Sequence, residues 1–151
     1  MNQDTTLYTY LKSLGEADSY VSTITKNATN DILQNKATIF PLLNIAITGA
    51  SYSSQQIKTF SLEISCFNKR DQNKETVNDI FWENDNEVDN MNETEACLNR
   101  IWLIMERNFD KNNITANENP SLSPVLEGTT SLIDGWVMTL DVNVPNIDIC
   151  L

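Results

Sequence analysis

Residues 135–144 read Gly-Trp-Val-Met-Thr-Leu-Asp-Val-Asn-Val, and this stretch decides the fold. From Trp136 onward every second side chain is apolar, and the side chains between them are mostly polar. A period of two is typical of a strand that buries one face. The dipeptide Asp134-Gly135 predicts a turn before this strand, and Pro145, which cannot donate a ladder hydrogen bond, predicts its end.

The rest of the chain carries one clear helical pattern and several strand patterns. Over 86–110 apolar residues recur at the helical spacing of about 3.6 residues, which predicts one long helix. A polar link at 51–56 joins two alternating segments and predicts an antiparallel hairpin. The segment 27–39 fits either a helical turn or a loop, and 112–124 reads as a loop. The other expected elements are a short helix over 4–15, a strand or extended arm over 19–26, and strands over 42–50, 57–67, 125–127 and 136–144.

Strands grouped around one long helix predict an α+β fold. We expect a mostly antiparallel sheet of four to five strands, with the long helix and the short N-terminal helix packed on it. The 151 residues predict a single domain over 1–151, long enough to fold without disulfides or metal. The expected core positions are Phe60, Leu62, Ile64 and Cys66 on a strand, and Val88, Met91, Leu98, Ile101, Trp102, Met105 and Phe109 on the long helix.

The charge of the chain is strongly negative and uneven. The formal net charge is −11, and residues 71–151 carry sixteen Asp and Glu against four Lys and Arg. Residues 1–70 are almost neutral, with five acids and six bases. A balance of this kind excludes nucleic-acid binding through counterion release, whereas it favours electrostatic docking on a basic partner.

Catalytic, cofactor and metal sites are not expected. The chain has no histidine, which excludes Ser-His-Asp and Cys-His arrangements, and its four glycines are too scattered for a phosphate loop. Three widely spaced cysteines are too few for structural zinc, and we expect Cys66 and Cys97 to be small core residues of a protein in a reducing cytosol. The acidic run 83–89 resembles part of a calcium loop but lacks its glycine, so an acid-rich helix start is preferred.

The segment 71–95 is the strongest candidate for an interaction surface. It holds nine acids and one lysine, and three consecutive apolar residues, 80–82, interrupt it. One interpretation is a solvated loop and first helical turn, and the other is a docking surface for a basic partner. Trp82 is the aromatic residue that periodicity explains least, so it is the best candidate for an interface anchor. The candidate interface residues are Phe81, Trp82, Glu83, Asp85, Glu87 and Asp89.

Several segments, taken in order, match a known pattern. The sequence Lys-Ala-Thr-Ile-Phe-Pro-Leu at 36–42 enters a strand, and the run 84–92 opens a helix that contains Leu-Asn-Arg at 98–100. Gly135-Trp136 and Val-Pro-Asn at 144–146 then precede Cys150. In this order the segments resemble small structural proteins of tailed bacteriophages, especially phages of Bacteroidetes hosts, including crAss-like phages. The chain is similar to neck or head–tail connector proteins of the tail-terminator or tail-completion kind, and 112–132 departs most from them.

The resemblance implies a non-enzymatic, ring-forming subunit at the head–tail junction of a virion, where it joins the portal to the tail. A dodecamer is favoured and a hexamer is the alternative. Double-stranded DNA would pass through such a ring without sequence-specific binding. A closed ring needs complementary heterologous surfaces, for which the chain offers the hairpin at 42–67 and the acids at 71–95. These acids either line the channel or dock on a basic neighbour.

The location that follows is the neck or tail region of a virion assembled in the cytoplasm of the host bacterium. No apolar run reaches the ~18 residues of a membrane span, and the N-terminus does not read as a signal peptide. The alternative function is a small acidic interaction protein of a phage, either a DNA mimic or an inhibitor of a host factor. That alternative explains the charge but not the ending at 135–146.

Overall fold

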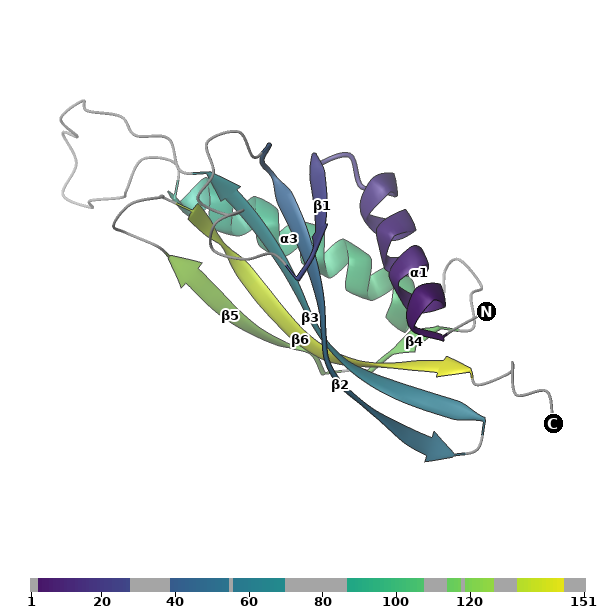
Figure 1. Ribbon diagram of the computed structural model, residues 1–151. Helices are drawn as coiled ribbons and strands as arrows, with labels where there is room; N and C mark the ends of the chain where they lie inside the picture. Colours follow the sequence, from purple (N-terminus) through teal and green to yellow (C-terminus); the bar gives the residue numbers. More distant parts are fainter. Residues whose placement is uncertain are drawn as a thin grey trace, which may run out of the picture.

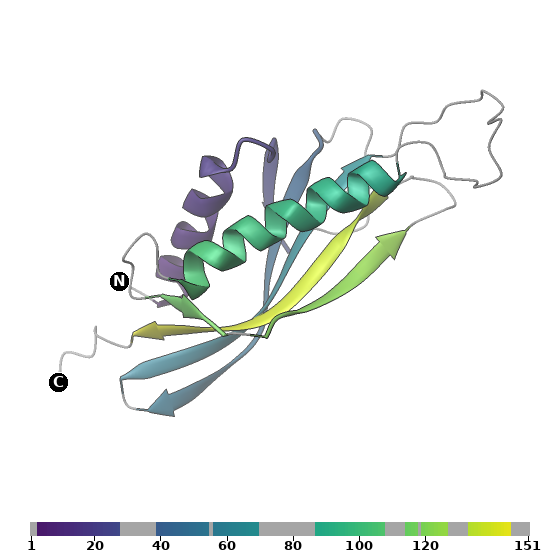
Figure 2. The ribbon, with the colours of Figure 1, turned by 180° about the vertical axis from the view of Figure 1, so that it is seen from behind.

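The computed structural model describes residues 3–27, 39–54, 56–69, 87–107, 114–117, 119–126 and 133–145. In chain order the elements are α1 (Gln3–Ala17), β1 (Thr23–Lys26), β2 (Leu42–Ser54), β3 (Ile57–Lys69), α3 (Glu87–Glu106), β4 (Thr115–Ala116), β5 (Ser121–Leu126) and β6 (Ile133–Pro145). The strands form one sheet, and both helices lie on the same face of it (Figures 1 and 2). The α+β class is therefore confirmed.

The sheet has six strands in the order β1-β2-β3-β6-β4, and β5 pairs with β6 beside β4. The expected count of four to five strands is too low, because β4 lies in the expected loop at 112–124. β5 overlaps the strand expected at 125–127 but begins four residues earlier, within that loop. β1 runs parallel to β2, and the other pairings are antiparallel. β5 contains Pro124 and lies at the edge of the sheet, where a missing N–H need not interrupt a ladder.

The core lies between the two helices and the sheet. Leu62, Leu98 and Met105 have no exposed surface, and Ile64 and Ile101 are almost fully buried. The expected inward faces of β3, β6 and α3 are thus largely confirmed. Val88 is an exception because it is 42% exposed, and Phe109 lies outside the described residues.

The hairpin of β2 and β3 is longer than its sequence pattern predicts. Pairing continues to Ser54 opposite Ile57, with register shifts near Thr48 and Ser53. The expected polar link at 51–56 is therefore mostly strand. The distal end, residues 49–54 and 56–59, is called the hairpin arm, and it extends beyond both helices (Figures 1 and 2).

The expected turn at Asp134-Gly135 is wrong. Both residues lie within β6, and Gly135 is paired with Phe67 of β3. A Cβ atom at position 135 would overlap the backbone oxygen of Cys66. The glycine therefore permits a close approach of two strands rather than a change of chain direction.

The helix-free face of the sheet has an apolar end and a polar remainder. Leu42, Phe67 and Ile133 form a small buried cluster at the end away from the hairpin arm. Elsewhere on this face many side chains are polar, and several of them form hydrogen bonds across strands. Ser61 Oγ donates to Asp141 at 3.1 Å, and Thr59 Oγ1 donates to Asn143 at 2.7 Å.

Candidate functional site

Most of the expected interface residues cannot be placed. Phe81, Trp82, Glu83 and Asp85 lie outside the described residues, and only the backbone of Glu87 is described, at the start of α3. Asp89 lies in the first turn of α3, where its side chain is exposed. An exposed acid in a first turn suits the positive end of the helix dipole, so its position alone does not imply a partner.

Beside Asp89, the first turn of α3 holds a buried polar network that the sequence interpretation missed. The side chain of Asn90 is 1% exposed, and its Nδ2 donates to the Lys69 carbonyl oxygen at 3.2 Å and to Asp134 Oδ2 at 3.3 Å. Asn90 Oδ1 accepts a hydrogen bond from Asn68 Nδ2 at 3.1 Å. These bonds hold the start of α3 against the end of β3 and the beginning of β6.

One signal for this network was present in the sequence. Asn90 and Thr94 continue the spacing of the buried positions Cys97, Leu98 and Ile101 toward the start of the helix. Polar residues that continue an apolar stripe are buried when they find partners. Thr94 confirms this, because its Oγ1 donates to the Asn90 carbonyl oxygen at 2.7 Å.

A second polar contact joins the end of α1 to the middle of α3. Arg100 donates from Nε and from its terminal nitrogen to the two carboxylate oxygens of Asp18, at 2.8 and 3.0 Å. The backbone N–H of Tyr20 donates to the same carboxylate at 3.0 Å. Burial alone would raise the pKa of Asp18, but these donors outweigh it and hold that pKa below its ordinary value.

The Asp18→Asn variant is expected to be less stable by about 1–2 kcal/mol at pH 7, since a charged and largely buried acceptor is lost. The pKa of Asp18 is lower in the folded state than in the unfolded state. The ionised carboxylate therefore stabilises the fold fully above its ordinary pKa of about 3.9, and this stabilisation is lost as the pH falls through the pKa of the folded state. Urea unfolding of both proteins from pH 7 to pH 3 measures the difference. A difference that stays constant over that range would contradict the assignment.

The thiols of Cys66 and Cys97 are core groups, as predicted. Both are free and fully buried. A hydrogen bond with the Cys97 thiol, together with burial, raises the pKa of Cys66. Cys66 therefore remains a protonated and unreactive thiol at neutral pH.

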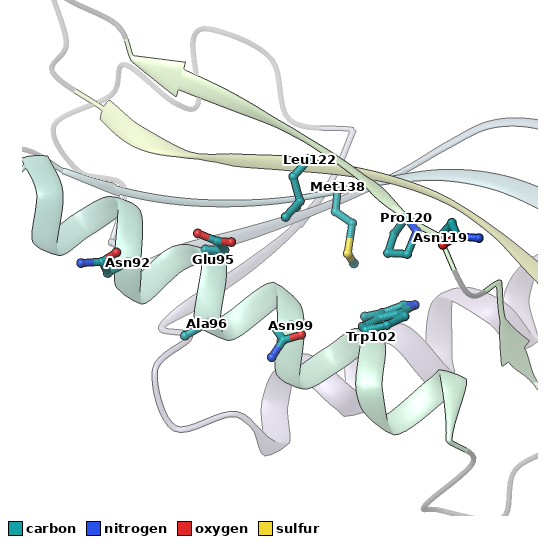
Figure 3. Close-up of a pocket in the computed structure, with 9 residues that line it drawn as sticks. All are labelled: Asn92, Glu95, Ala96, Asn99, Trp102, Asn119, Pro120, Leu122 and Met138. Carbon is teal, nitrogen blue, oxygen red and sulfur yellow. The ribbon is translucent and has the colours of Figure 1, made fainter.

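A groove lies between α3 and β5 (Figure 3). Its volume is about 530 Å³, and it is called the α3–β5 groove. Trp102 projects from α3 toward Pro120, while Leu122 and Met138 reach toward the helix from β5 and β6 (Figure 3). Around this apolar floor lie the polar side chains of Asn92, Glu95, Asn99 and Asn119.

Trp102 lines the groove in a fixed position. The indole Nε1 donates to the Asn117 carbonyl oxygen at 2.9 Å, which fixes the ring between α3 and the chain that leads from β4 to β5. Leu122 remains 40% exposed beside it. An apolar floor with amide and carboxylate groups at the rim suits a side chain with an apolar body and a polar tip. Trp102 was expected in the core, and it instead lies half-buried at this floor.

Among the residues that the structure describes, no group of three or more His, Cys, Asp or Glu side chains could hold a metal ion. Neither α1 nor α3 is both long and apolar enough to cross a membrane. No protein-family model matches the chain, and no curated protein sequence matches it significantly.

Proposed function

We propose that this chain is a non-enzymatic structural protein of a tailed-phage virion that forms a closed homo-oligomeric ring at the neck. The observation that carries the proposal is the hairpin arm. It extends beyond the subunit's own helices and exposes 68% of Tyr52 and 39% of Ile57. The base of the arm pairs with β6, and its Lys58 contacts Asp4 of α1. The exposed tip with Tyr52 gains less stability within its own subunit, so it is suited to contact a neighbour.

The order of sequence motifs agrees with this assignment, because it resembles neck and tail-completion proteins over nearly the whole chain. In the proposed ring, the subunits join the portal to the tail in virions assembled in the cytoplasm of the host bacterium. Double-stranded DNA passes through the ring, and the net charge of −11 per subunit keeps the phosphates from binding tightly. A twelvefold ring fits the portal, and a sixfold ring fits a tail tube.

The acids favour the ring over the alternative of a DNA mimic. A mimic must present free carboxylates at the surface, spaced like phosphates. Here Asp134 is fully buried, Asp18 is paired with Arg100, and Asp4 lies 3.3 Å from the ammonium of Lys58. These three carboxylates serve the subunit itself, so they do not add to a mimicking surface.

Native mass spectrometry of the full chain tests the proposed ring. A dodecamer of 17.1 kDa subunits is expected near 205 kDa, and a hexamer near 103 kDa. Because each subunit is strongly acidic, the assembled fraction should rise as salt screens repulsion between about 0.05 and 0.5 M. In virions of the source phage, the copy number relative to the major capsid protein should be a multiple of six. Absence from virions would contradict the proposal.

A further inference from the structure

We infer that the hairpin arm of one copy docks in the α3–β5 groove of the next copy, with Tyr52 as the anchor. This inference rests on the proposed ring and names the contact that closes it. Tyr52 is the most exposed large hydrophobic side chain of the described residues, at 68%. The groove is an apolar hollow whose floor includes Leu122, itself 40% exposed. Each surface thus has apolar area that its own subunit leaves uncovered.

The chemistry of the two surfaces is complementary. A tyrosine side chain has an apolar ring and a hydroxyl group that both donates and accepts hydrogen bonds. The groove offers Trp102 and Met138 to the ring, and Asn99 and Glu95 near the rim to the hydroxyl. A buried aromatic anchor in a pocket with a polar rim is the usual arrangement of an energetically dominant contact.

The charge distribution favours the arm as the partner of an acidic groove. The chain has no Asp or Glu between Asp31 and Glu63, although it has 21 acids in total. The arm itself therefore carries no acid, and its Lys58, 5.7 Å from the Tyr52 ring centroid, is paired with Asp4 of α1 at 3.3 Å. The groove carries Glu95 at its rim. Between copies with a net charge of −11, an arm without acids of its own adds no negative charge at this rim, and the nearby Asp4 is paired with Lys58.

The geometry requires a second copy. The arm lies at one end of the sheet, and β5 extends toward the other end (Figures 1 and 2). A subunit therefore cannot place its own arm in its own groove. Arm and groove are different surfaces, so the contact is heterologous, which is the type that generates rings. The outer edge of β5 does not offer simple strand addition instead, because Pro124 removes a backbone donor from that strand.

Site-specific photo-crosslinking of the full chain tests this contact. With p-benzoylphenylalanine in place of Tyr52, irradiation should produce intermolecular crosslinks to peptides containing residues 92–102 or 119–122. The matched control carries the same group at Ile57, on the same arm. Ile57 pairs with Pro145, and the alternation along β3 places it on the opposite face from Lys58, which pairs with Tyr52. The control should not crosslink to the groove.

Two substitutions give a second readout. Tyr52→Ser should raise the concentration needed for half-assembly by at least about tenfold, whereas Tyr52→Phe should raise it only a few-fold. Neither should change the melting temperature of the subunit, since Tyr52 is largely exposed. Unchanged assembly of Tyr52→Ser would overturn the inference.

The outcomes separate this inference from the proposed function. A ring that forms without crosslinks from position 52 to the groove overturns the arm–groove contact and leaves the ring. Crosslinks to the groove within a two-membered assembly support the contact and contradict the ring. A chain that stays monomeric at all concentrations and salt levels overturns both.

Discussion

Replacing Leu62 with alanine is expected to lower the free energy of unfolding by about 2–5 kcal/mol. Leu62 lies on β3, the strand between β2 and β6, and it has no exposed surface. It is paired with Ile47 on one side and Leu140 on the other, under the layer of helices. Shortening it leaves a cavity that rigid neighbouring strands cannot close. Because domains of this size are stable by about 5–15 kcal/mol, the loss is a large fraction of the total.

Urea unfolding followed by circular dichroism measures this loss, and Glu63→Ala is the matched control. Glu63 is the next residue on the same strand, but its side chain is exposed on the helix-free face. Its removal should change stability by no more than about 0.5 kcal/mol. If Leu62→Ala unfolded at the same urea concentration as the wild type, the inward face of β3 would be assigned incorrectly.

Strong periodicity in the sequence predicted β3, β6 and α3, which bury mainly one face. Much of β3 and β6 alternates because one face meets the helices while the other meets solvent, and α3 has a buried stripe for the same reason. Residues 64–67 and 133–135 are the exceptions, since they are buried on both faces. The distal part of β2 was read as a polar link because Ser51, Ser53 and Ser54 are exposed and lie beyond the core. A strand that buries neither face has no periodicity to detect.

The elements that the sequence did not predict depend on partners far along the chain. β4 and the first four residues of β5 were expected to be loop, and both strands form by pairing with β6. Only the end of β5 overlaps the strand expected at 125–127. Pro124 favours a loop by its local chemistry, yet an edge strand tolerates it. The parallel pairing of β1 with β2 likewise joins residues that are 19 positions apart, such as Thr23 and Leu42.

The candidate site was predicted less completely than the fold. Acidic residues around 71–95 were identified from charge, and of the six candidates only Asp89 has a described side chain. The α3–β5 groove has no sequence signal, because Trp102 and Leu122 meet only through the tertiary arrangement. The helical spacing marks Asn90 as a buried position, but it does not identify its partner Asp134, which is 44 residues away.

Replacing Asn90 with leucine is expected to destabilise the subunit by about 2–3 kcal/mol. The carboxylate of Asp134 is fully buried, and it would lose the hydrogen bond from Asn90 Nδ2. The Lys69 carbonyl oxygen would lose the donor at 3.2 Å in the same change. A buried charge that loses a donor costs more than a neutral group does, so the effect should exceed that of an ordinary hydrogen bond. Urea unfolding at pH 7 measures the loss, and Asn92→Leu, at an exposed position on the same helix, is the control.

A double-mutant cycle with Asp134→Asn separates this charge effect from the loss of packing. In the Asp134→Asn background no charge remains beside position 90, so Asn90→Leu should cost only about 1–2 kcal/mol there. The cycle would then give a coupling energy of about 1 kcal/mol between the two side chains. Additive effects of the two substitutions would mean that Asn90 does not stabilise the subunit through Asp134. Because the network ties the first turn of α3 to β3 and β6, its loss should also increase hydrogen exchange in that turn before the rest of the helix.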